Sequence, residues 1–195
     1  MTASTSWPVL AQAHEALLAA VSGVAPGDWD RHTPCSEWNA AQVLQHAAGD
    51  QLGYAAFLGE GTGPDEDPFA PSGKLGGEPV AVAEAAVRTA ATAWSRVPED
   101  AVDVTVPLPP NKMPAALGAH VCALDAAVHA WDIAVATGQS SPLTAELAAE
   151  LLDAARQFVE PLRAFAFAPV VPAAPDDDAI AELLKYLGRN PDWTA

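Results

Sequence analysis

The chain has 195 residues, which suits a single domain spanning 1–195, and half of its residues are hydrophobic, enough to build a buried core. Its formal net charge of -16 argues against a nucleic-acid partner and against an anionic membrane surface, because both would repel it. Alanine outnumbers the β-branched residues, and only 7% of residues are aromatic. This composition favours helices that pack closely through small side chains.

Two features of the sequence bear on its compartment. The segment from Met1 to Pro8 has neither the basic nor the apolar region of a signal peptide. No stretch of about 18 apolar residues predicts a transmembrane helix. We therefore expect a cytoplasmic protein without a membrane partner, in which Cys35 and Cys122 are free thiols rather than a disulfide.

Proline and glycine divide the first part of the chain into predicted helices and loops. The spacing of apolar residues predicts a helix over about 7–24, with His14 on its surface. A second helix is predicted over about 39–58, because Asn39 is a good N-cap and Gln42 is placed to complete a capping box.

The remaining elements follow the same punctuation. The acidic, Gly- and Pro-rich stretch 61–79 is predicted to be a long surface loop, and 102–106 alternates like a strand, which indicates a short hairpin or an extended loop. Further helices are predicted over about 80–97, 115–137, 144–162 and 179–187. The sum is an all-α, up-and-down four-helix bundle with additional short helices, on which the C-terminal tail from about 164 to 195 packs.

The helix predicted over 115–137 carries a carboxylate and an imidazole one turn apart. Asp125 and His129 are separated by four residues, so their side chains project from one face. Such a pair can share a divalent metal, form a salt bridge at the surface, or form a hydrogen bond in the core. The spacing alone leaves these three interpretations open.

The position of this pair on its helix favours a site between helices. The apolar stripe of the helix is formed by Val121, Leu124, Val128, Trp131 and Val135, and its flank carries Cys122, Asp125, His129 and Asp132. Bundles place their ligands on such a flank. His46 shares a face of the second helix with Val43 and Ala47, so it is expected to point inward and to be the best third ligand. Asp50 and Asp132 are expected either to accept hydrogen bonds from the histidines or to be exposed.

Several segments together resemble a known family. The first signature consists of Thr33-Pro34-Cys35, Trp38-Asn39, Val43-Leu44 and His46; the second runs from His129 to Ala134 and continues with Ala136-Thr137-Gly138. These resemble signatures of the DinB-like metalloenzyme superfamily, and in particular the metal-binding domain family of mycothiol-dependent maleylpyruvate isomerase. The tail from Leu183 to Pro191 is similar to that of one actinobacterial branch.

The resemblance implies a DinB-like four-helix bundle with one divalent metal near one end. Carried over position by position, it implies His46, Asp125 and His129 as the metal ligands. Zinc is the implied ion, with nickel as the alternative, and mycothiol is the implied cosubstrate. The implied partners are a small-molecule thiol and a small electrophile, and bundles of this kind often form homodimers.

Two features depart from the isomerase pattern. Position 125 is Asp where the pattern has Glu, and this carboxylate reaches about one methylene less far. The chain is also expected to be too short for the additional C-terminal domain of the isomerase. Both features count against the isomerisation itself, although not against the metal site.

Three hypotheses for the function follow. The first is a metal-dependent thiol S-transferase or isomerase-like enzyme, in which mycothiol supplies the nucleophile and neither cysteine is required. The second is a non-catalytic metal-binding or ligand-sensing module. The third is a helical bundle without a metal. The sequence assigns no catalytic residue.

Overall fold

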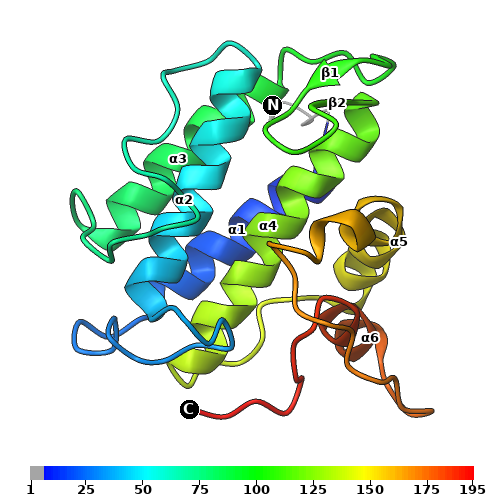
Figure 1. Ribbon diagram of the computed structural model, residues 1–195. Helices are drawn as coiled ribbons and strands as arrows, with labels where there is room; N and C mark the ends of the chain where they lie inside the picture. Colours follow the sequence, from blue (N-terminus) through cyan, green and yellow to red (C-terminus); the bar gives the residue numbers. More distant parts are fainter. Residues whose placement is uncertain (1–6) are drawn as a thin grey trace, which may run out of the picture.

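The computed structural model describes residues 7–195. The prediction that Met1 to Pro8 do not form a signal peptide therefore concerns residues that lie largely outside the described part of the chain. In the described part of the chain, the elements in order are α1 (Pro8–Ser22), α2 (Ala40–Phe57), α3 (Pro79–Trp94), β1 (Val104–Thr105), β2 (Lys112–Met113), α4 (Ala115–Ala136), α5 (Ala145–Leu162) and α6 (Ala179–Tyr186), as Figure 1 shows.

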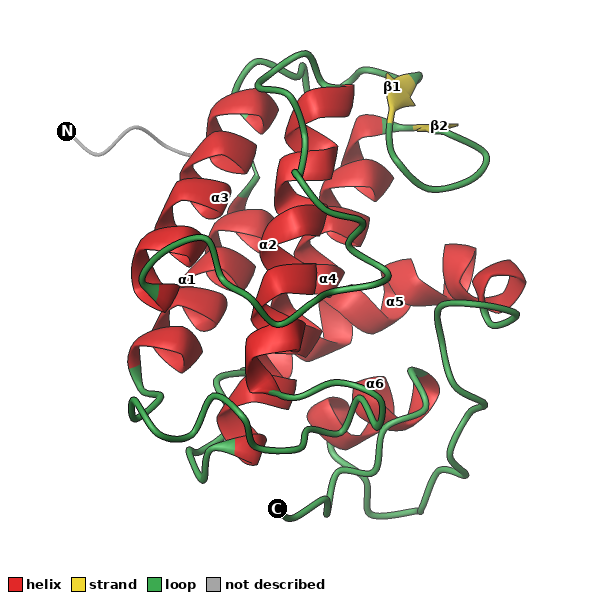
Figure 2. Cartoon of the chain, turned by 60° about the vertical axis from the view of Figure 1, so that its left-hand side comes forward, coloured by secondary structure: helices red, strands yellow, loops and turns green. Residues whose placement is uncertain are grey.

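The first four helices form a bundle. Helix α4 packs on α1 and α2, and α3 packs on the other side of α1 and α2 (Figure 1). Helix α5 contacts another face of α4, and α6 packs against α5 and lies below it in the view of Figure 2. The prediction of an all-α four-helix bundle with additional short helices is confirmed.

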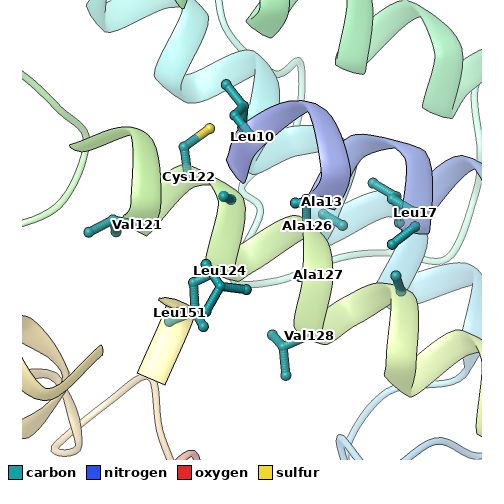
Figure 3. Close-up of a cluster of buried hydrophobic side chains, with 14 of the residues drawn as sticks. Leu10, Ala13, Leu17, Val121, Cys122, Leu124, Ala126, Ala127, Val128 and Leu151 are labelled. Atoms are coloured by element: carbon teal, nitrogen blue, oxygen red, sulfur yellow. The ribbon is translucent and has the colours of Figure 1, made fainter. Parts of the chain in front are cut away.

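Helix α4 is the central element of the molecule and is apolar on two faces. On one face, Ala126 and Ala127 meet the α1 residues Leu10, Ala13 and Leu17, and on the other face Val121, Leu124 and Val128 turn toward Leu151 of α5 (Figure 3). The alanines allow the α1 and α4 backbones to approach closely, as the composition indicates. The predicted stripe is therefore the α5-facing side of a helix that is buried on both sides.

Helix α4 also has the length and hydropathy of a membrane span. It is the one described helix that meets this test, and 83% of its most apolar window is buried within the protein. A helix in the centre of a bundle is apolar on most sides because it is covered by other helices, and this position accounts for the hydropathy of α4.

Local signals define several helix ends as predicted. The Asn39 side chain accepts a hydrogen bond from the backbone N–H of Gln42, and the Gln42 side chain accepts one from the backbone N–H of Asn39, which completes the capping box of α2. Proline occupies the first position of α1 and of α3, where its missing N–H costs nothing.

The short segment before α4 is a hairpin. Strands β1 and β2 are antiparallel, with Val104 opposite Met113 and Thr105 opposite Lys112. Of the two alternatives offered for 102–106, the hairpin is therefore confirmed.

One expectation about the first half of the chain needs correction. His14 is not on the surface: its side chain is 4% exposed, and its Nε2 donates to Oε1 of Gln51 at 2.8 Å. The error arises because α1 is covered by both α3 and α4, which no pattern within α1 reveals. The prediction of a long surface loop over 61–79 is confirmed, because these residues form no helix or strand before α3 begins at Pro79 and most of them are exposed. The loop lies against α2, and Gly49 permits this approach because an added Cβ would lie 3.2 Å from Pro68.

The C-terminal tail lies against α5 and α6. Helix α6 buries Leu183 and Leu184 in the same apolar cluster as the bundle helices, and Asp178 caps its first turn. The backbone N–H of Val171 donates to the carbonyl of Lys185, which ties the Pro-rich segment to α6. The assignment of 1–195 to one domain stays a prediction, which this shared core supports.

Candidate metal centre

The three residues expected to bind a metal lie together. His46 comes from α2, and Asp125 and His129 come from neighbouring turns of α4. Oδ1 of Asp125 lies 3.4 Å from Nε2 of His46 and 3.4 Å from Nε2 of His129. A tetrahedral zinc ion with ligand bonds near 2.1 Å separates its ligand atoms by about 3.4 Å. The spacing therefore fits one shared ion, and the shorter carboxylate of Asp125 does reach both histidines.

Hydrogen bonds orient both imidazole rings toward Asp125. Nδ1 of His46 lies 2.8 Å from the carbonyl oxygen of Pro68, which can only accept, so this nitrogen carries the proton. Nδ1 of His129 donates in the same way to Oδ2 of Asp132 at 2.9 Å. In the neutral rings, each Nε2 lone pair is then free for a ligand, as in most protein metal sites.

The electrostatics of the cluster also suit a cation. Burial works to raise the pKa of Asp125, but the adjacent His129 and His46 hold that pKa below its usual range. Burial works to lower the pKa of His129, but Asp125 raises it well above its usual value. Oδ2 of Asp125 is buried and has no hydrogen-bond partner among residues 7–195. A divalent ion would replace the shared proton and could occupy the unpaired oxygen, so the donor set fits a metal.

Asp132 accepts a hydrogen bond from Nδ1 of His129, on the side of the ring that faces away from Asp125. Of the two alternatives stated for Asp132, it is therefore the hydrogen-bond acceptor and not an exposed residue. Its side chain is fully buried and accepts two hydrogen bonds from Arg189, at 2.9 Å from Nε and 2.8 Å from Nη2. The Cys35 thiol donates to Asp132 at 3.2 Å. Burial raises the pKa of Asp132, but the stronger influence of Arg189 and His129 holds that pKa below its usual range.

Asp50 borders the site as well. Burial, followed by the negative charge of Asp125, raises the pKa of Asp50 to about 7. Asp50 is half-buried, so the interpretation of Asp50 as an exposed residue is wrong. Its neighbour one turn further along α2, Tyr54, is buried and contributes to the same cavity, although the sequence singled out no role for it.

A cavity of about 230 Å³ opens beside the candidate ligands. Its polar wall is formed by His46, Asp50, Tyr54, Asp125 and His129, and its apolar wall by side chains of α4, α5 and the segment after α5. A more open cavity of about 400 Å³ adjoins it and shares Cys35, Trp38 and Arg189 with it. The candidate ligands therefore border a smaller cavity that adjoins a larger and more open one.

The other singled-out residues lie away from this centre or in supporting positions. His120 binds Glu150 at the surface and lines neither cavity of the site. Cys122 is buried in the core and Cys35 is partly exposed, and both are free thiols, which confirms that expectation. No local sequence pattern indicates a role for Arg189 in the site, because it lies 57 residues from its partner Asp132.

Comparison with known proteins agrees with the resemblance. Residues 10–134 match the family model described as the mycothiol maleylpyruvate isomerase N-terminal domain. Uncharacterized proteins of two Mycobacterium tuberculosis strains are each 32% identical over 184 residues, covering 92% of this chain and 94% of their own length.

Two solved structures share the fold. The crystal structure of the mycothiol-dependent maleylpyruvate isomerase aligns with a TM-score of 0.65 at 17% identity, over 94% of this chain and 88% of that one. A histidine-to-alanine mutant of the same enzyme aligns with a TM-score of 0.59 at 16% identity, over 87% of this chain and 79% of that one.

This coverage corrects one expectation. The chain spans most of the isomerase structure, so the argument that it is too short for a further C-terminal domain was wrong. The family model covers well over half of the residues, and the chain belongs to the mycothiol maleylpyruvate isomerase N-terminal domain family.

Proposed function

We propose that the chain binds one divalent metal ion through His46, Asp125 and His129, with zinc as the expected ion and nickel as the alternative. The observation that carries this proposal is the position of Asp125 Oδ1, 3.4 Å from both Nε2 atoms. The Nδ1 atoms of both rings are already engaged by Pro68 and Asp132, which supports the same assignment. Two histidines and a carboxylate form a donor set that suits zinc with an open coordination position.

We further propose that the protein is a metal-dependent thiol S-transferase or isomerase-like enzyme that acts on a small electrophile with a mycothiol-type thiol. Membership of the family and the adjoining cavities support this proposal. When bound, zinc lowers the pKa of a thiol and holds it as a thiolate at neutral pH. A thiolate held there would add to an electrophilic carbon of the second molecule as the π bond at that carbon breaks, and the atom that receives the electron pair would take up the proton that the thiol lost. The adduct would then be released, or the C–S bond would break again after isomerisation, with the double bond re-formed and the proton returned to the thiol.

The residues of the chain have defined parts in this reaction. Asp132 holds the His129 ring in position, and Pro68 holds the His46 ring. The apolar wall provides a surface for the hydrocarbon part of the substrate. A cytoplasmic location and a homodimer stay predictions.

Metal analysis tests the ligand assignment. Protein purified without a nickel column should contain one divalent ion per chain, and the double variant His46→Ala/His129→Ala should contain none. The variant His120→Ala is the matched control, because its imidazole binds Glu150 outside the cavity. Stoichiometric metal in the double variant would show that the ligands are assigned wrongly.

Adduct formation tests the activity separately. Metal-loaded protein is incubated with mycothiol and an electrophile, and the conjugate is measured by mass spectrometry. The expected result is conjugation that depends on the metal. Conjugation no faster than in the metal-free control would favour a non-catalytic metal-binding or ligand-sensing module.

A further inference from the structure

Phenylalanine is concentrated around the cavity that the candidate metal ligands border. The chain has five phenylalanines, and four of them line this cavity: Phe69, Phe158, Phe165 and Phe167. The fifth, Phe57, lines neither cavity of the site. In a chain in which only 7% of residues are aromatic, this concentration indicates a role for the rings in binding a ligand.

Packing within the protein does not account for two of these rings. Phe69 is 48% exposed and Phe165 is 60% exposed, whereas Phe158 is 8% exposed. The two open side chains belong to different loops, Phe69 to the loop before α3 and Phe165 to the segment after α5, and they line the same cavity. Covering an exposed aromatic ring is favourable, so both side chains offer apolar surface to a ligand.

The aromatic lining continues to the candidate metal centre. The ring of Phe69 lies edge-on to the ring of His46, with 5.6 Å between the centroids, and the centroid of Trp38 lies 4.7 Å from that of His46. Helix α4 adds three aliphatic side chains to the wall, those of Val121, Leu124 and Val128. A ligand that reaches the metal position therefore contacts hydrocarbon surface along the rest of its length.

The volume of the cavity suits one aromatic ring. It is about 230 Å³. An engineered cavity of about 150 Å³ that is lined by Leu, Ile and Phe side chains holds one benzene molecule in another protein. The space here therefore accommodates a ring with a short reactive substituent. Because aromatic rings pair more favourably than their buried area alone accounts for, the lining favours a ring over an alkyl chain of similar size.

We propose that the cavity binds an aromatic ring of the electrophile, with the reactive end of the molecule directed toward His46, Asp125 and His129. Phe165 is then a residue that determines this specificity. Near the metal position, an anionic group and an uncharged carbonyl oxygen are both acceptable, because a divalent ion attracts either. This inference rests on the proposed function, since it names the class of electrophile that the thiol attacks.

Binding of two unreactive alcohols tests the preference for a ring. Benzyl alcohol and pentan-1-ol each carry one hydroxyl group, and pentan-1-ol is the slightly more hydrophobic of the two, but only benzyl alcohol has a ring. Titrations followed by NMR are carried out on the wild-type protein with and without zinc. We expect benzyl alcohol to bind about threefold to tenfold more tightly, because its ring pairs with the phenylalanines.

Nuclear Overhauser effects locate the bound ring. In protein with labelled methyl groups, the ring protons of benzyl alcohol should show these effects to the methyl groups of Val121, Leu124 and Val128, which line the cavity. Effects confined to methyl groups of exposed residues outside the cavity, such as Val102 and Val170, would overturn the inference.

Two variants then isolate one ring of the lining. Phe165→Leu removes the ring but keeps an apolar side chain at an exposed position, so the protein should fold normally. It should weaken benzyl alcohol binding by about twofold to fivefold and leave pentan-1-ol binding unaltered. Phe57→Leu is the matched control, because Phe57 is 46% exposed and lines neither cavity, and it should change neither affinity.

Two further results would also overturn the inference. One is equal affinity of the wild-type protein for the two alcohols, a measurement that needs no variant. The other is a Phe165→Leu protein that binds benzyl alcohol as tightly as Phe57→Leu does. Because binding is measured without a thiol, and without zinc as well as with it, failure here is distinguishable from failure of the proposed metal and thiol chemistry.

Discussion

At the scale of single residues, Asp132 determines the geometry around His129. Its buried carboxylate accepts hydrogen bonds from the imidazole of His129, from the guanidinium of Arg189 and from the thiol of Cys35. Three groups from distant parts of the chain thus depend on one negative charge. A carboxylate in this position also makes the imidazole a better metal ligand.

The variant Asp132→Asn tests this role. It keeps the size of the side chain but removes the charge, and it leaves the buried guanidinium of Arg189 without its counter-ion. We expect the free energy of unfolding to fall by about 3–5 kcal/mol. If His129 is a ligand, zinc affinity should also fall by about tenfold to a hundredfold. Chemical denaturation and competition with a zinc chelator measure the two effects.

A matched control separates the buried charge from a general loss of acidity. Asp153→Asn removes a carboxylate whose side chain is 82% exposed and pairs with Arg156 at the surface. Its effect on stability should stay within about 0.5 kcal/mol, and zinc affinity should not change. Equal effects of the two variants would contradict the assigned role of Asp132.

His14 makes the stability of the protein depend on pH. Burial lowers the pKa of His14, although its hydrogen bond to Gln51 acts in the opposite direction. The unfolded chain, in which the pKa of histidine is about 6.5, therefore binds more protons than the folded chain over the range below that pH. Stability is retained above about pH 6.5 and is lost as the pH falls toward the lower pKa of the folded state.

The comparison of wild type with His14→Gln measures this contribution. The amide of Gln can still donate to Gln51 but does not titrate. The stability advantage of the wild type over the variant should shrink on acidification below pH 6.5, by at most about 1.4 kcal/mol per pH unit. For the exposed His32, the variant His32→Gln should stay within about 0.5 kcal/mol of wild type. An advantage over His14→Gln that does not vary with pH would contradict the prediction.

At the scale of secondary-structure elements, the close contact of α1 with α4 depends on small side chains. Ala13 of α1 and Ala126 of α4 are fully buried where the two helices meet (Figure 3). A larger side chain at such a point forces the helices apart or into strained rotamers, because protein interiors are close-packed.

The variant Ala126→Leu tests this packing. We expect it to lower the free energy of unfolding by about 1–3 kcal/mol through overpacking. The control Ala91→Leu makes the same change on an exposed position of α3, where helix propensity is nearly unaltered. Denaturant titrations of both variants compare the effects, and a neutral Ala126→Leu would show that α1 and α4 tolerate a wider separation.

At the scale of the whole molecule, the C-terminal tail completes the site. The chain passes from α6 through Gly188, whose φ is +82°, to Arg189, which reaches back to Asp132 on α4. The same turn lies against Ala168 of the segment that follows α5. The position of Arg189 therefore depends on contacts between two distant loops.

The variant Gly188→Ala tests this dependence. An added Cβ would lie 2.6 Å from Cβ of Ala168, which is closer than two carbon atoms approach without a covalent bond. The alanine would also have to keep the positive φ of Gly188, which residues with a side chain rarely adopt. Gly138→Ala is the matched control, since Gly138 has a φ of +76° but open space around the added Cβ. The control should lose about 1–2 kcal/mol of stability from the backbone conformation alone.

Gly188→Ala should lose more stability than Gly138→Ala, and it alone should weaken zinc binding, because a displaced Arg189 no longer holds Asp132. Thermal unfolding and zinc competition are the measurements. Equal losses in the two variants, with zinc binding unchanged, would show that the tail does not position the site.

Local periodicity made the helical framework and the candidate ligands predictable. Asp125 and His129 face the same way because four residues make about one helical turn, and His46 points inward because its neighbours on α2 are apolar. The capping box at Asn39 marked the beginning of α2 for a similar reason, since both of its residues lie within one turn. The long-range partners of these residues carry no such local signal.

The sequence by itself determined the all-α class, the principal helices and the pairing of Asp125 with His129, because these depend on interactions within a few residues. Only the tertiary structure decided that Pro68 and Arg189 orient the site, that His14 is buried, and that the buried Tyr54 hydroxyl has no hydrogen-bond partner among residues 7–195. Each of these depends on which surfaces the helices and loops present to one another. Such contacts join residues far apart in the chain, so no window of sequence contains them.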